Sequence, residues 1–120
     1  MGLDVYLKRK YIVSYDEGKT FEDREETVFT SNITHNLNKM AMEAGIYQAC
    51  WRPEEIVAFK AKDITPTLEK GLADLKQRPD HFKKFDSENG WGVYDDFVPW
   101  VEEYLLACHL YPEATIEVSR

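Results

Sequence analysis

The spacing of apolar residues changes period along this chain of 120 residues. Near both ends apolar residues alternate with polar or amphipathic ones, in the segments Leu3-Asp4-Val5-Tyr6-Leu7 and Thr115-Ile116-Glu117-Val118-Ser119. Between the ends they recur about every 3.6 residues. Alternation indicates a strand with one buried face, whereas the longer period indicates a helix with one buried stripe. The sequence therefore predicts an α+β fold in which the two ends of the chain supply the sheet.

The N-terminal part of the chain is typical of a long β-hairpin. The run 11–15 is β-branched and aromatic, the run 16–19 (Asp-Glu-Gly-Lys) is a turn signal, and 27–30 is typical of a returning strand. We predict that strands near 2–15 and 26–30 pair antiparallel and that 114–119 joins them. The tip, residues 16–26, is charged, and we expect it to be mobile and to contact partners.

The middle of the chain predicts three or four helices packed on that sheet. The first should begin near Ser31 or Asn32, which can cap a helix, and stop at Gly45. A second is predicted over 63–77, with Pro66 in its first turn, and a short helical turn is predicted over 80–85. The clearest amphipathic stripe, over 94–111, contains Phe97, Trp100, Val101, Tyr104, Leu105 and Cys108. We predict Trp100, Tyr104 and Cys108 to be core residues, and one domain over residues 1–120.

Composition excludes several classes of function. The chain carries 22 acidic and 15 basic residues, a net charge of −7, which disfavours binding to a nucleic-acid backbone. It contains no long apolar run and no signal-peptide pattern, so we expect no membrane association and a cytoplasmic location. The two cysteines, Cys50 and Cys108, have no zinc-type spacing, and we expect reduced buried thiols with no metal or cofactor.

Two segments carry more polar or aromatic groups than local structure requires. In the segment 31–38, three Asn and a His open the first predicted helix, and we expect Asn32, His35 and Asn36 to share one stripe with Lys39 and Glu43. Asparagine offers donors and an acceptor together, so these side chains could read the polar edge of a base, sugar or amide. The alternative is that one Asn caps the helix and the others face solvent.

The second segment is 89–94, in which Trp91 and Tyr94 lie among glycines. With Trp51 and Arg52 these aromatics could form a stacking platform, on which Arg52 meets an anionic group. The alternative is that the tryptophans fill the core while the glycines shape a turn. The predicted ligand-binding residues are Asn32, His35, Asn36, Arg52, Trp91 and Tyr94.

Enzymatic alternatives stay open at this point. His35 with Glu43 could transfer protons, and Cys50 with His35 could act as nucleophile and base. No motif supports either pair, and we assign no catalytic residue.

Three stretches of the chain resemble a known family. Met1-Gly2-Leu3-Asp4-Val5-Tyr6-Leu7, the segment from Asn32-Ile33-Thr34-His35-Asn36-Leu37 to Trp51-Arg52-Pro53-Glu54-Glu55, and the segment from Asn89-Gly90-Trp91-Gly92 to Arg120 are similar to a family of small proteins in bacteriophage and prophage genomes. The similarity spans nearly the whole chain apart from the hairpin tip. It implies a phage-encoded accessory protein of the host cytosol, acting against host defence by binding an effector protein or sequestering a nucleotide messenger.

These observations lead to one function and two alternatives. The first expectation is a non-enzymatic protein that binds a small polar, nucleotide-like ligand. The first alternative is an inhibitor that masks a basic site on a host protein with its acidic surface, and the second is a small enzyme. Homo-oligomerisation stays open.

Overall fold

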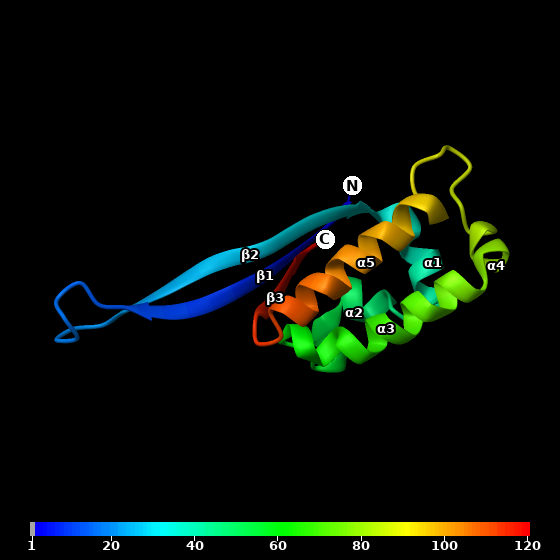
Figure 1. Cartoon of the computed structure of the whole chain (residues 1–120). Helices are drawn as coiled ribbons and strands as arrows, with labels where there is room; N and C mark the ends of the chain where they lie inside the picture. Colours follow the sequence, from blue (N-terminus) through cyan, green and yellow to red (C-terminus); the bar gives the residue numbers. More distant parts are fainter. Residues whose placement is uncertain (1) are drawn as a thin grey trace.

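A computed structural model describes residues 2–120, and it confirms the predicted α+β class. The elements in chain order are β1 (Gly2–Val13), β2 (Glu22–Thr34), a 3₁₀ turn (His35–Leu37), α1 (Asn38–Glu43), α2 (Tyr47–Trp51), a second 3₁₀ turn (Pro53–Ile56), α3 (Ala61–Gln77), α4 (Pro79–Lys83), α5 (Tyr94–Leu110) and β3 (Thr115–Ser119). The helices gather at one end of a long hairpin (Figure 1).

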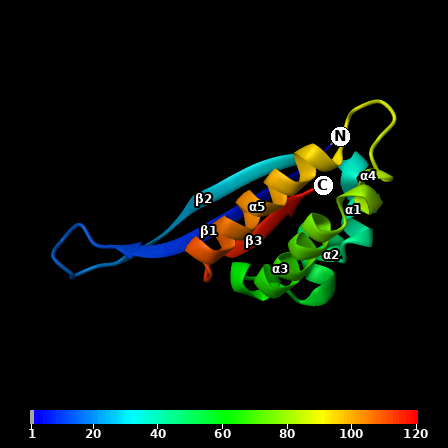
Figure 2. The same cartoon turned by 45° about the vertical axis from the view of Figure 1, so that its right-hand side comes forward.

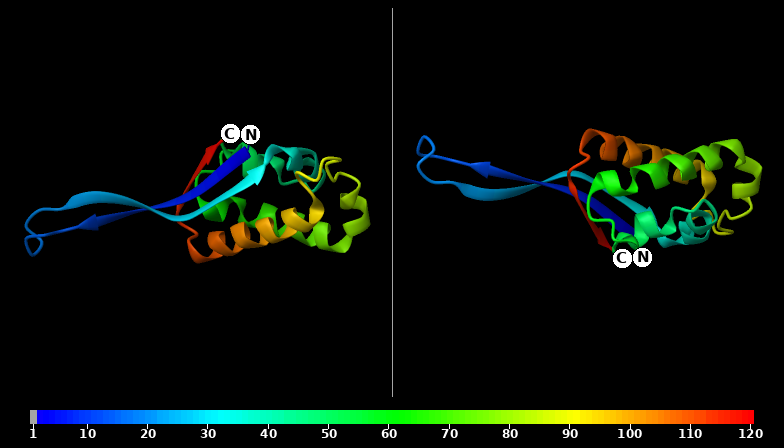
Figure 3. Two further views of the ribbon diagram at one scale, coloured as in Figure 1. Left: turned by 90° about the horizontal axis from the view of Figure 1, so that it is seen from above. Right: turned by 90° about the horizontal axis from the view of Figure 1, so that it is seen from below.

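The sheet consists of the hairpin and the C-terminal strand, all antiparallel, as predicted. The strand order is β2-β1-β3. Because β1 lies in the centre, its alternating residues Leu3, Val5 and Leu7 are fully buried. Two long helices, α3 and α5, run side by side against that face (Figure 2), and both chain termini lie at the same end of the sheet (Figure 3). This layer of helices on one side of the sheet explains why one face of each strand is apolar and the other polar.

The core continues along α5, where the predicted stripe is confirmed. Trp100, Tyr104 and Cys108 are buried, and the Tyr104 ring stacks on Phe29 of β2 at 5.9 Å between centroids. The Trp100 indole N–H and the Tyr104 hydroxyl are buried without a hydrogen-bond partner among the described residues. This part of the interior is therefore held by packing alone.

The predicted start of the first helix is wrong. Ser31 and Asn32 belong to β2, which continues to Thr34 and pairs Asn32 with Asp4 of β1. Cross-strand pairing with the buried β1 outweighs the capping preference of Ser and Asn. Asn32 therefore does not share a helical stripe with His35 and Asn36. The predicted stop is confirmed, since Gly45 takes φ +77° just after α1.

The second helix also begins earlier than predicted, at Ala61. This start places Pro66 at the sixth helical position, beyond the first turn in which it was expected. Pro66 has no N–H to donate to the preceding turn, and its side chain is exposed. Buried residues on both sides of it, Ile64 and Leu68, keep the helix on the core.

The hairpin leaves the helices as a projecting arm, which we define as residues 9–26. A β-bulge lies at its base, because Leu7 pairs with Phe29 while Lys8 pairs with Thr27, leaving Val28 as the extra residue. A bulge bends a strand and strengthens its twist. Beyond it no helix covers the ribbon, and the whole molecule measures 60 × 27 × 23 Å (Figure 1).

The tip of the arm is a defined turn, shorter than predicted because β2 resumes at Glu22. The Asp16 carboxylate accepts hydrogen bonds from the backbone of Lys19 and Thr20 and from the Thr20 hydroxyl, at 2.7–3.1 Å. These bonds, the Thr20 hydroxyl first, hold the pKa of Asp16 below its ordinary value. An ion pair between Arg9 and Glu26 joins the two strands nearer the base.

Candidate functional site

The polar segment at the end of β2 uses most of its hydrogen-bonding groups inside the protein. Asn32 donates from Nδ2 to the Asp4 carboxylate at 2.7 Å and to the Leu3 carbonyl at 3.3 Å. Thr34 accepts a bond from the Asn36 backbone N–H at 3.3 Å and so caps the 3₁₀ turn. Capping is thus performed by Thr34, and the asparagines have other partners.

His35 is oriented by a buried tryptophan. The Trp51 indole N–H donates to His35 Nδ1 at 2.9 Å, so this nitrogen is an acceptor and cannot carry a proton at the same time. Trp51 itself is 1% exposed and stacks on Tyr47 at 5.5 Å between ring centroids. Trp51 is therefore a core residue and offers no stacking platform to a ligand.

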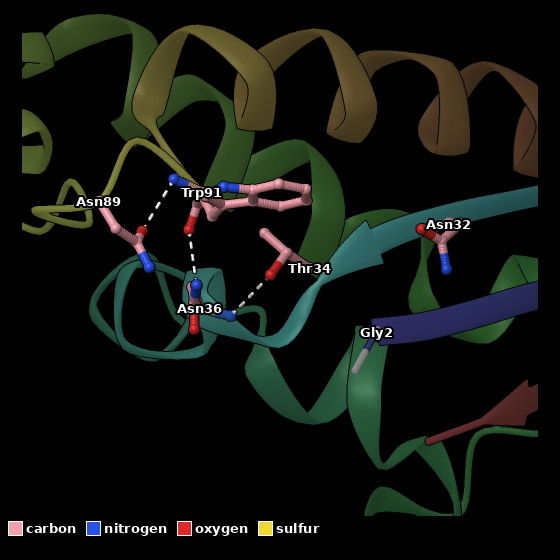
Figure 4. Close-up of a pocket in the computed structure, with 6 residues that line it drawn as sticks. All are labelled: Gly2, Asn32, Thr34, Asn36, Asn89 and Trp91. Carbon is pink, nitrogen blue, oxygen red and sulfur yellow. Dashed lines mark hydrogen bonds between the residues drawn. The ribbon is translucent and has the colours of Figure 1, made fainter.

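Asn36 connects the helix start to the loop that carries Trp91. Its Nδ2 donates to the Trp91 carbonyl at 2.8 Å, and the Trp91 N–H donates to Asn89 Oδ1 at 2.9 Å (Figure 4). Gly92 has φ +107°, and a Cβ at this position would lie 2.9 Å from Asn36 Cβ. Both the conformation and the close approach require glycine. The backbone of Trp91 is consequently fixed on both sides.

The Trp91 side chain nevertheless remains in solvent, with 71% of its surface exposed. It borders a hollow of about 530 Å³, which we name the Trp91 hollow, lined by Gly2, Asn32, Thr34, Asn36, Asn89 and Trp91 (Figure 4). The structure thus brings together three of the six predicted ligand residues, Asn32, Asn36 and Trp91. They come from strand, turn and loop instead of one helical stripe.

His35 lies on the neighbouring side of Asn36. A second hollow of about 620 Å³, named the Lys84 hollow, is lined by His35, Asn36, Asn38, Lys39, Lys84, Phe85, Asp86 and Ser87. Asn36 belongs to both hollows. Lys39 and Lys84 are exposed and form no ion pair within residues 2–120.

The other two predicted residues have structural partners and line neither hollow. Arg52 donates to the Tyr47 hydroxyl at 3.4 Å and lies 3.7 Å from the Glu55 carboxylate. The Tyr94 hydroxyl donates to the Leu75 carbonyl at 2.8 Å, and its ring packs against the core below Lys83.

Several lining residues were not predicted, namely Gly2, Thr34, Asn38, Asn89, Lys39 and Lys84. Asn89 stands next to Gly90 in the same loop as Trp91, and this Asn-Gly pair is a turn signal that could have nominated it. Lys84 lies just after the short helix α4, and its nearness to Asn36 depends on tertiary packing alone.

The remaining reactive side chains are poorly placed for catalysis. Cys50 and Cys108 are buried, and burial raises the pKa of the Cys50 thiol far above its ordinary value and that of Cys108 to about 12. A protonated thiol is a weak nucleophile. Within residues 2–120 no three His, Cys, Asp or Glu side chains converge as a metal site would require.

Comparison of the chain with protein-family models, with curated proteins and with solved structures finds no match. Among residues 2–120, none of the helices has both the length and the apolar character needed to cross a bilayer. The function is therefore inferred from the site itself.

Proposed function

We propose that this protein is a non-enzymatic binding protein for a small polar molecule that contains a flat ring, such as a nucleoside or its monophosphate. The observation that carries the proposal is Trp91, whose backbone is fixed by two hydrogen bonds while its indole is 71% exposed. An exposed indole on a fixed backbone offers a stacking surface, and only its two side-chain torsions have to be ordered when a ligand stacks on it.

The chemistry of the Trp91 hollow favours an uncharged polar group beside the ring. Its six lining residues carry no formal charge. Asn36 donates to Trp91 through its amide nitrogen, which leaves its oxygen as an acceptor, whereas Asn89 accepts through its oxygen and keeps its amide nitrogen as a donor. Adjacent donors and acceptors are what the edge of a nucleobase requires.

The Lys84 hollow supplies the positive charge that the sequence led us to expect from Arg52. Lys39 and Lys84 line this hollow, which shares Asn36 with the Trp91 hollow. His35 lines it too, as does Asp86, whose carboxylate already accepts the Tyr94 backbone N–H. We infer that an anionic group of the ligand lies there while the ring lies on Trp91. Two lysines in an open hollow suit one phosphate better than a triphosphate.

A protein that binds without catalysis is also consistent with the other side chains. His35 Nδ1 is occupied by Trp51, and both thiols are buried away from the two hollows. This arrangement disfavours the pairing of Cys50 with His35 as nucleophile and base.

The natural fluorescence of the protein provides the test. The chain has three tryptophans, of which Trp51 and Trp100 are buried, so ligand stacking should quench the emission of Trp91. We would titrate nucleosides and nucleoside monophosphates, after native mass spectrometry of the purified protein has shown what it retains. We expect saturable quenching, lost in Trp91→Ala, and at least tenfold weaker binding in Asn36→Ala, which corresponds to about 1.4 kcal/mol.

Two neighbouring lysines give a matched control for the anionic site. Lys84→Ala should weaken binding of a monophosphate and leave binding of the nucleoside unchanged. Lys83→Ala, whose ammonium lies over the Tyr94 ring instead of in the hollow, should change neither. Absence of quenching by every compound, together with nothing retained in the native mass spectrum, would refute the proposal.

A second candidate is the inhibitor of a basic protein surface, which the exposed acidic strand of the arm favours. Glu22, Asp23 and Glu25 lie on the exposed part of β2, away from the helices. Reversing their charges should abolish capture of such a partner, whereas Trp91→Ala should leave it intact. The two candidate functions therefore predict opposite effects of these substitutions on binding.

A further inference from the structure

The arm has an open backbone edge. Strand β3 pairs with β1 only from Asp4 to Lys8, and from Arg9 to Val13 β1 pairs with β2 alone. Within residues 2–120, no strand occupies the other side of β1 in this stretch. Unpaired N–H and C=O groups in an extended strand are a template for pairing with another strand.

Large apolar side chains surround this edge in solvent. Ile12 is 65% exposed, and the tip residues Tyr15 and Phe21 are 78% and 69% exposed, while Tyr11 is also exposed. Within the arm no helix covers them, and the tip is held by hydrogen bonds of Asp16 and not by apolar packing. Apolar surface gathered on a projecting element indicates a contact surface.

We propose that the arm pairs antiparallel with the arm of a second copy of this chain along this edge. A two-fold axis that places Tyr11 opposite its own copy sets Arg9 opposite Val13 and Lys10 opposite Ile12. The two arms then form one ribbon with the strand order β2-β1-β1-β2. Identical surfaces meet, as the symmetry of a two-fold dimer requires.

Charge favours this register. No like charges stand directly opposite each other across the new strand pair, and the two Tyr11 rings form an aromatic cross-strand pair. Arg9 is already neutralised by Glu26 of its own chain. The acidic residues of β2 lie on the two outer strands of the ribbon, where they do not face each other.

The same register ends the new strand pair beside a hollow on the other copy. Ile12 and Val13 of one copy lie beside Lys10 and Arg9 of the other, and the strand pairing ends there because β3 occupies the same edge of β1 from Lys8 to Asp4. A hollow of about 510 Å³ lies there, lined by Arg9, Lys10, Lys60, Leu110, Tyr111, Pro112, Glu113, Ala114 and Thr115. Leu110 is exposed in this hollow, next to the point where the pairing between the two copies ends.

The exposed aromatic side chains supply a large part of the area that a stable dimer buries. Tyr11, Tyr15 and Phe21 are 41%, 78% and 69% exposed, so covering their exposed parts in both copies would remove roughly 550–950 Å² at about 150–250 Å² per ring. Ile12, Leu110 and the paired backbone add to this. Stable interfaces typically bury about 1,200–2,000 Å².

Complementary charges at the symmetry axis test the proposal. In multi-angle light scattering, the wild-type chain should have twice the monomer mass of 14.0 kDa. Tyr11→Lys and Tyr11→Glu place like charges opposite each other, so each should be monomeric alone, and an equal mixture should restore the dimer. Met42→Lys, at an exposed apolar position of α1, which lies at the opposite end of the molecule from the arm (Figure 1), should remain dimeric.

A crosslink gives a second readout that does not depend on mutations that weaken association. Because Cys50 and Cys108 are buried, Tyr11→Cys introduces the one exposed thiol of the described chain. Under mild oxidation it should form a disulfide-linked dimer within minutes, whereas Met42→Cys, at an exposed position of α1, should crosslink at least tenfold more slowly. A wild-type monomer at 100 µM, on the order of the concentrations at which weak dimers form, would overturn the proposal. So would a dimer that survives Tyr11→Lys, or equal crosslinking of the two cysteine variants.

Discussion

Strands β1 and β2 run through both the arm and the rest of the described chain, which we name the body (residues 2–8 and 27–120). Different forces stabilise these two parts. Up to Leu7, β1 buries alternate side chains under α3 and α5. Beyond the bulge the same strand buries almost nothing, and the ribbon is held by its backbone hydrogen bonds to β2, by ion pairs and by the Asp16 turn. Hydrophobic burial stabilises by about 25 cal/mol per Å², whereas an exposed ion pair contributes about 0–1 kcal/mol.

The comparison shows that the arm is not needed to complete the core. A two-stranded ribbon without a covering layer is marginal by itself, so its length and its exposed aromatics serve something other than the stability of the monomer. The Trp91 site lies in the other part, where the Trp91 backbone is bonded to Asn36, a residue of the turn between β2 and α1. The two proposed surfaces thus lie on the two different parts of the molecule.

The largest expected effect separates core from arm directly. Trp100→Ala should lower the free energy of unfolding by about 3–5 kcal/mol, as large-to-small core substitutions do. Ile12→Ala should change it by less than about 0.5 kcal/mol in dilute protein, because Ile12 is exposed. Urea unfolding followed by circular dichroism measures both, and equal losses would show that the arm is part of the cooperative core.

Much of the fold follows from local pattern. The sheet was correctly predicted from the alternation at 3–7 and 115–119, and α5 from the 3.6-residue stripe over 94–111. Both predictions succeed because burial on one side imposes these periods on any sequence. The end of β2 was mispredicted because Ser31 and Asn32 are good caps locally, while their cross-strand partners Val5 and Asp4 are distant in sequence.

The candidate site could be predicted only in part for the same reason. Unusual composition nominated Asn36 and Trp91, and the structure joins them by a hydrogen bond across 55 positions of sequence. Arg52 was nominated for its charge alone, and the structure gives it Tyr47 and Glu55 as neighbours. Lys39 was placed on the predicted stripe but was not assigned to the ligand. Lys84 carries no local signal, since isolated exposed lysines are common on every surface.

A smaller effect tests whether water is excluded from the core of the body but has access to the side chains of the arm. The Tyr104 hydroxyl is buried without a partner, so Tyr104→Phe should raise the free energy of unfolding by about 1 kcal/mol. The Tyr15 hydroxyl accepts a bond from Arg24 in solvent, and Tyr15→Phe should change stability by less than about 0.5 kcal/mol. A loss of more than about 1 kcal/mol in Tyr104→Phe would mean that water reaches the hydroxyl and satisfies it.

The smallest effect concerns Glu113, which lies where the body meets the base of the arm. Its carboxylate receives bonds from the Lys60 and Lys62 ammonium groups, each at 2.9 Å, and these bonds lower its pKa from 4.5 to about 2. Because the pKa is lower in the folded state, the stabilisation is fully present above pH 4.5 and is lost as the pH falls toward 2. All three side chains are exposed, so salt should weaken the effect. We expect Glu113→Gln to flatten the decline of the melting temperature over this pH range, and Glu103→Gln, on the exposed face of α5, to leave it unchanged. An NMR titration that places the pKa of Glu113 above 4 would show that the two lysines do not hold the carboxylate in solution.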